Sequence, residues 1–216
     1  EVLAVEPDER AAELAADLWR QHATRADVLD ALLGLWKTPE ALAADLPALV
    51  ADLPLLPEAP ASLPDDPRAL RDAVAQRLAE GVATHGETYR QQLRDALEED
   101  ILNKSSYKPD WIEPLFQHLL HWSRHPDATT EFDERLARLT LDALTDKTRK
   151  ARAGSTPVSP LQPLIADYMQ VLARCSEWRR QQSIVLLHQL RDEARQRLAR
   201  HKQQYRVQTY DDLIDG

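Results

Sequence analysis

The sequence predicts an all-α protein. Ala, Leu, Arg, Gln and Glu dominate its 216 residues and glycine is scarce at 5, a composition that favours helices. Apolar residues recur every three or four positions, and runs of β-branched residues typical of strands are almost absent. Apolar residues make up 43% and charged residues 29%, which is ordinary for a globular chain of one or two domains. We therefore expect an irregular multi-helix fold with long helices.

The first part of the chain is expected to form three helices. The first spans about residues 8–22 and the second about 25–36, with Thr24 as the N-cap of the second. Thr38 is expected to cap the third helix, with Pro39 at the favoured first position.

A proline-rich segment follows. Residues 52–67 hold five prolines and predict a stiff, extended linker that no helix crosses. This linker would separate an N-terminal helical part, 1–51, from a helical body, 68–208, whose C-terminal third is basic.

The body should begin with a long helix. Asp66 and Pro67 are expected to open it and Leu102 to end it, which corresponds to a length of roughly 50 Å. Its larger apolar residues, from Leu70 to Leu97, recur nearly once per turn. Such a narrow stripe predicts a helix that touches a neighbour along one edge and is otherwise solvated.

Similar signals predict the remaining elements. Asp110 is expected to cap a helix, and Glu113 to complete a capping box with it. A further helix carries well-spaced apolar residues over 132–143. The Gly/Ser/Pro-rich segment 147–160 predicts a mobile loop, and 161–205 predicts the final helical stretch.

Residues 209–216 begin a helix that has no room to continue. Thr209 and Asp212 form a Thr-x-x-Asp capping pattern, yet barely one turn follows. We expect this chain to be cut from a longer protein.

Charge is distributed unevenly along the chain. Residues 1–146 carry a net charge of −15, residues 147–206 carry +9 and residues 207–216 carry −3, which gives the overall −9. The basic segment is suited to a polyphosphate partner, whereas the acidic part would repel one.

Several function classes lack their sequence signals. No glycine-rich phosphate loop is present, so we expect no nucleotide cofactor in this chain. Cys175, the only cysteine, fits a reducing, cytoplasmic location, and no apolar run reaches membrane length.

Three clusters could carry chemistry, but structural roles are expected for all of them. His118, His121 and His125 span two helical turns, too far to converge on one metal ion without bending. Cys175 lies among arginines without a candidate base. Glu98, Glu99 and Asp100 are consecutive and so point in different directions. We predict no catalytic residue and no metal site.

Clustered cations are the sharpest functional signal. The candidate DNA-binding residues are Lys104, Lys108, Lys147, Arg149, Lys150, Arg152, Arg179 and Arg180. Flexible basic loops can contact phosphates without reading bases. The alternatives are a polar helix connection around Lys104, cations that stabilise a helix C-terminus near Lys147, and a solvated arginine face on the last helix.

Five segments of the chain resemble segments of one known protein family, and they occur in the same order as in that family. They are Ala16–His22, Leu35–Leu42, Asn103–Ile112, Leu190–Tyr205 and Tyr210–Leu213. The last resembles the aromatic-Asp-Asp-Leu element of UvrD/RecB-type helicases, and the basic helix before it is similar to one in the same family. Together they resemble RecB-type beta subunits of RecBCD helicase–nucleases (exodeoxyribonuclease V).

This resemblance implies a position and a role. The position is the helical 1B insertion of the first motor domain, between the Walker A and Walker B motifs, so ATP, Mg²⁺ and the nuclease centre would belong to the parent protein. The implied role is sequence-independent contact with duplex DNA ahead of the unwinding point. Other subunits of a RecBCD-like complex would be partners, and no membrane is expected.

Two alternatives remain open. The acidic part and the apolar stripe from Leu70 to Leu97 suit a protein-docking module that seats on partner subunits. A free-standing helical enzyme is the other alternative.

Overall fold

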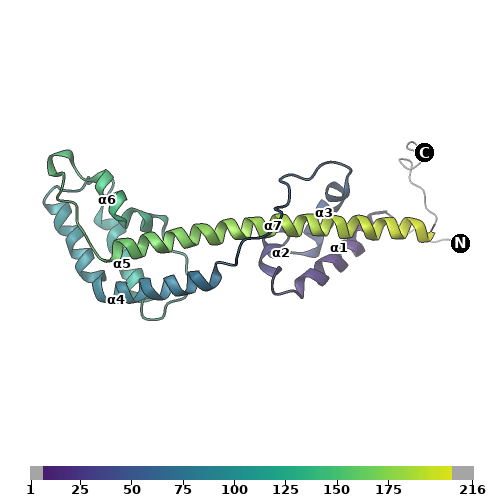
Figure 1. Cartoon of the computed structure of the whole chain (residues 1–216), viewed down its shortest axis with the longest axis horizontal. Coiled ribbons are helices and arrows are strands. Elements are labelled where there is room, and N and C mark those ends of the chain that lie inside the picture. Colours follow the sequence, from purple (N-terminus) through teal and green to yellow (C-terminus); the bar gives the residue numbers. More distant parts are fainter. Residues whose placement is uncertain (1–6, 206–216) are drawn as a thin grey trace. The chain divides into compact units, whose positions relative to one another are not determined.

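The computed structural model describes residues 7–205, and within this range it is all-α, as predicted. The α-helices are α1 (Pro7–Ala23), α2 (Leu29–Leu35), α3 (Pro39–Val50), α4 (Arg68–Glu98), α5 (Pro109–Trp122), α6 (Leu141–Lys147) and α7 (Leu161–Tyr205). Two 3₁₀ helices, η1 (Glu134–Leu139) and η2 (Lys150–Arg152), flank α6. The helical ribbons are shown in Figure 1. The expected helix start at 209–216 lies outside the described residues.

Two compact units make up the chain. Unit 1 comprises residues 1–64 and 177–216, and unit 2 comprises residues 65–176. The expected body, 68–208, therefore differs from the observed division, because α7 after Ser176 belongs with the N-terminal helices. Leu186, Leu190 and Ala194 of α7 share one buried cluster with residues of α1, α2 and α3.

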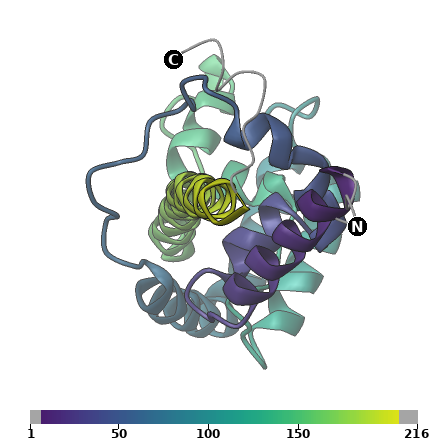
Figure 2. The same cartoon turned by 90° about the vertical axis from the view of Figure 1, so that its right-hand side faces the viewer.

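The proline-rich segment between α3 and α4 has no helix, as expected, and side chains of α7 contact its first part. Its irregular course is visible in Figure 2. Arg191 donates to the carbonyls of Ala51, at 3.0 Å, and Leu53. The ring nitrogen of His188 lies 3.0 Å from the carbonyl oxygen of Pro57.

Arg191 and Arg195 therefore do not belong to a solvated arginine face. The side chain of Arg191 is buried, and Arg195 donates to the carbonyl of Val50 at 3.1 Å and to that of Ala51. Both guanidinium groups satisfy carbonyls that α3 leaves without an intrahelical donor at its C-terminus.

Local capping signals gave mixed results. Thr38 Oγ1 accepts from the amide of Ala41 at 3.3 Å, so the predicted cap of α3 is confirmed. The prediction that Thr24 caps the second helix was wrong. Its hydroxyl donates back to the carbonyl of Gln21, and α2 begins only at Leu29.

The predicted capping box of Asp110 and Glu113 at the start of α5 was also wrong. Asp110 lies inside the first turn, and the N-cap position is occupied by Lys108, which makes no side-chain cap. The carboxylate of Glu113 instead accepts from Arg90 at 2.5 Å and from Arg94 at 2.6 Å, both on α4.

The long helix α4 is packed over a much wider face than predicted. Its eleven buried residues include alanines and glycines beside the larger apolar side chains. Gly81 lies so close to α7 that an added Cβ would be 2.4 Å from Leu164 Cδ1. The prediction of a helix that touches a neighbour along only a narrow stripe was wrong, because small residues widen the stripe into a broad contact face.

Unit 2 is built around this helix. Its buried cluster draws on α4, α5, η1, α6 and the first part of α7. The expected helix over 132–143 is instead the 3₁₀ helix η1 followed by α6. Among the described residues, no helix is both long and apolar enough to cross a membrane.

Candidate nucleic-acid interface

Two basic loops that are far apart in the sequence lie side by side in unit 2. The first basic loop is residues 103–108 and the second is residues 147–152. Leu102 and Thr148 form an isolated antiparallel bridge. Around it, the amide of Asn103 donates to the carbonyl of Lys147 at 3.0 Å, and that of Arg149 donates to Ile101 at 2.8 Å. Six of the eight candidate cations are thereby brought onto adjoining backbone.

The first basic loop is held by its own side chains. Asn103 Oδ1 accepts from the amide and the hydroxyl of Ser105, at 2.9 and 2.8 Å. The ring of Tyr107 is buried, and its hydroxyl donates to the carbonyl of Arg138 at 2.7 Å. Burial raises the pKa of Tyr107 to about 12, so the hydroxyl stays a neutral donor. Tyr107 anchors the loop and leaves Lys104 and Lys108 exposed.

The second basic loop, at the start of the segment 147–160, has defined contacts. Thr148 Oγ1 lies 2.9 Å from the carbonyl of Leu144 and 2.9 Å from Thr156 Oγ1. The turn η2 follows, and Gly154 then takes a φ of +89°, which favours glycine. The cations of the loop, Lys147, Arg149, Lys150 and Arg152, are all exposed.

A buried network supports this arrangement from within the core. Tyr89 Oη donates to the carbonyl of Leu139, at the end of η1, at 2.6 Å and accepts from Gln162 Nε2 at 3.2 Å. The same Nε2 donates to the carbonyl of Pro157 at 2.9 Å, and Gln162 Oε1 accepts from the amide of Ser159 at 3.1 Å. The network therefore joins α4, η1 and the segment that follows the second basic loop.

One carboxylate joins the two basic loops. Asp100 Oδ1 lies 2.8 Å from Lys104 Nζ and 3.5 Å from a terminal nitrogen of Arg149. The hydrogen bond from Lys104, with the charges of Lys104, Arg149 and Arg152, lowers the pKa of Asp100. Lys147 pairs with its neighbour Asp146 at 2.6 Å. All these groups are exposed, and such pairs are weak enough for another anion to replace them.

Residues of the first basic loop line two hollows. One, of about 290 Å³, is lined partly by Arg94, Lys104 and Lys108. The other, of about 260 Å³, is lined partly by Arg138 and Lys147. Sequence reasoning did not single out Arg94 and Arg138 because each has one other arginine within four residues, Arg90 and Arg135 respectively. Only the fold brings them to the loops.

The two remaining candidates, Arg179 and Arg180, belong to unit 1. Both lie exposed on α7. Arg180 donates twice to Glu177, at 2.9 Å each, and these bonds together with one from Gln181 lower the pKa of Glu177 to about 2. The structure therefore does not bring these two arginines together with the basic loops within one unit.

The other chemical candidates have no converging geometry. No group of three His, Cys, Asp or Glu residues placed to hold a metal ion occurs within residues 7–205. The ring of His118 packs against Phe132, with a centroid separation of 5.1 Å. Cys175 is buried in the core of unit 2.

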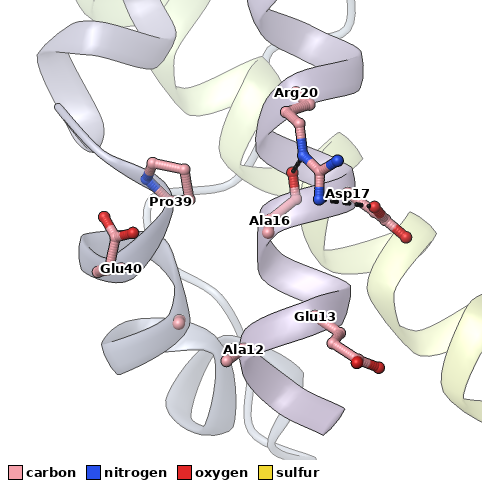
Figure 3. Close-up of a pocket in the computed structure, with 8 residues that line it drawn as sticks. Ala12, Glu13, Ala16, Asp17, Arg20, Pro39 and Glu40 are labelled. Atoms are coloured by element: carbon pink, nitrogen blue, oxygen red, sulfur yellow. Dashed lines mark hydrogen bonds and ion pairs between the residues drawn. The ribbon is translucent and has the colours of Figure 1, made fainter. Parts of the chain in front are cut away.

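Unit 1 contains a separate groove between α1 and α3. Its volume is about 670 Å³, and alanines together with Pro39 form the apolar part of its lining. Figure 3 shows the charged residues around it, where Arg20 bonds to Asp17 and to the carbonyl of Ala16. Among the lining residues that the structure describes, Arg20 is the one cation, and it is already paired on its own helix, so we assign the groove no chemistry.

Comparisons with known proteins add no family assignment. No protein-family model matches the chain. A search of curated proteins likewise finds no significant match.

Proposed function

We propose that this chain is a DNA-contacting helical module of an ATP-dependent helicase–nuclease of the RecB type, acting in double-strand break repair and recombination. The parent protein would be the cytoplasmic enzyme, with ATP and Mg²⁺ bound by its motor regions. This chain would supply contacts to duplex DNA and to other subunits. The proposal rests on the five segments that resemble that family and on the paired basic loops.

The pairing of the two loops is the observation that carries DNA contact. Together they hold six Lys or Arg residues and no Asp or Glu. The bridge between Leu102 and Thr148 places these cations on adjoining backbone. Exposed cations from a fixed backbone suit the regularly spaced phosphates of DNA, whose contacts carry no base information.

The salt dependence of DNA binding tests this proposal. Replacing the four cations of the second basic loop by alanine should reduce the slope of log affinity against log salt by up to about 3–4 units, because each lost phosphate contact removes about 0.9. A short fluorescent duplex titrated at several salt concentrations provides the measurement.

A matched variant controls for net charge. It replaces four other cations of unit 2, at the opposite end of α4 or beyond α5: Arg68, Arg71, Arg77 and Arg124. Its slope should stay close to that of the wild type. The proposal fails if the slope of the loop variant is unchanged, or if both variants lose the same amount.

One of the two observations behind the protein-docking alternative, an apolar stripe on α4 open to a partner, does not hold in the structure. The apolar stripe on α4 is buried from Val74 to Leu97, and only Leu70 remains well exposed, at 43%. A docking module would now have to use other surfaces. Cross-linking to partner subunits through unit 2, with no change in DNA affinity in the loop variant, would favour it.

A further inference from the structure

Asp100 occupies a backbone position that does not favour a carboxylate. It follows the end of α4 and has a φ of +58°. Glycine and asparagine are the usual residues in this left-handed conformation after a helix. A negative charge is also disfavoured there, because the C-terminus of a helix is the negative end of its dipole.

The contacts of Asp100 lie on the basic loops instead. Its carboxylate contacts Lys104 of the first loop and Arg149 of the second. The side chains of all three residues are about half exposed. The carboxylate therefore occupies, on the open surface, the place that a phosphate would take between these two cations.

From this geometry we infer that Asp100 is an internal competitor of the phosphate group and sets the affinity and selectivity of the paired basic loops. This inference rests on the proposed DNA contact. A phosphate of the duplex must displace Asp100 before it can pair with Lys104 and Arg149. Removing the carboxylate should therefore strengthen DNA binding.

The same competition disfavours small anions. A free phosphate ion must displace a carboxylate that is tethered beside both cations and so has a high effective concentration. A duplex brings many phosphates at once and gains from the release of its condensed counterions. Asp100 thus favours an extended polyanion over a single phosphate ion.

The substitution Asp100→Asn tests this role with little risk to folding, because asparagine adopts the left-handed conformation readily. One added unit of positive charge should steepen the salt slope by about 0.9. The ratio of variant to wild-type affinity should then be about 3.5 times larger at about 50 mM salt than at about 200 mM. Inorganic phosphate should compete for the loops more effectively in the variant.

Glu80→Gln is the matched control. It removes the same charge from the exposed face of α4 twenty residues earlier, about 30 Å along the helix. Screening at physiological salt has a length of about 8 Å, so this control should change DNA affinity little.

A double variant, Lys104→Ala with Arg149→Ala, separates the two hypotheses. It should weaken DNA binding, and adding Asp100→Asn to it should give no further gain. If the double variant binds more weakly but Asp100→Asn changes affinity no more than Glu80→Gln does, the role of Asp100 is refuted and DNA contact survives. If the double variant binds as the wild type does, both are refuted.

Discussion

Removing one hydroxyl from the core of unit 2 should destabilise it and weaken DNA binding without changing the salt slope. The variant is Tyr89→Phe. Tyr89 is fully buried, and its hydroxyl bonds to the carbonyl of Leu139 at 2.6 Å and to the amide of Gln162 at 3.2 Å. Phenylalanine keeps the ring, which packs edge-on against Phe116 at 5.7 Å, so the change isolates the hydrogen bonds.

The expected loss of stability can be worked out from the two groups that lose the Tyr89 hydroxyl as a partner, the carbonyl of Leu139 and the side-chain amide of Gln162. Gln162 is only 2% exposed, and leaving buried polar groups without a partner costs about 1–3 kcal/mol. A middle value of about 2 kcal/mol corresponds to roughly a 30-fold larger opening constant, since every 1.4 kcal/mol is tenfold. Hydrogen exchange of the amides in α4 and η1 measures this opening within unit 2.

Tyr168→Phe is the matched control. Tyr168 is also fully buried, but its hydroxyl has no hydrogen-bond partner in the described part of the chain. Removing that hydroxyl should leave stability unchanged or raise it. Equal exchange rates in the two variants would refute the argument from the network.

The effect of Tyr89→Phe on DNA binding distinguishes the positioning of the basic loops from their charge. Tyr89→Phe leaves all six loop cations in place, so the salt slope should match that of the wild type. Affinity should fall, because the segment after the second basic loop loses a support through Gln162. A change in the slope would show that the loops respond in some other way.

Two further predictions concern side chains whose roles the structure revised. Arg191→Ala should destabilise unit 1 by at least about 1.5–3 kcal/mol, the contribution of one hydrogen bond from a charged donor, since two such bonds are lost; denaturation should show no such loss for the exposed Arg179→Ala. Arg94 and Arg90 lower the pKa of Glu113 below its ordinary 4.5, so Glu113 stabilises the fold above that pH and the contribution is lost as the pH falls through the lowered value. The difference in unfolding free energy between wild type and Glu113→Gln should therefore narrow in acid, and a constant difference from pH 6 to pH 3 would contradict this.

Sequence reasoning succeeded where a contact is local and has no competitor. The cap at Thr38 is an example, because its hydroxyl oxygen accepts from the amide of Ala41, three residues away. The hydroxyl also bonds to the carboxylate of Glu40, but there it donates, so the two bonds do not compete. Thr24 and Glu113 carry equally good signals and fail because other atoms are available to them. Thr24 bonds to the preceding turn, and Glu113 binds arginines of α4.

The candidate site, too, could be predicted from the sequence only in part. Both basic loops could be identified from composition alone, because clustered cations are visible along the chain. Their pairing could not be predicted, since it depends on a bridge between Leu102 and Thr148, 46 residues apart. The sequence predicts only a structural role for Asp100 within the acidic run Glu98–Asp100, because its two cationic partners come together only in the fold.

Charge outside the loops limits where a polyanion can approach unit 2. Apart from the six cations of the two basic loops, residues 65–176 contain 9 Lys or Arg and 18 Asp or Glu. On charge alone, a polyanion would be repelled by most of this surface and attracted at the loops. Such asymmetry steers association as well as holding the complex. Reversing the loop charges should therefore slow association with DNA at low salt, whereas loss of close contacts alone would mainly speed dissociation.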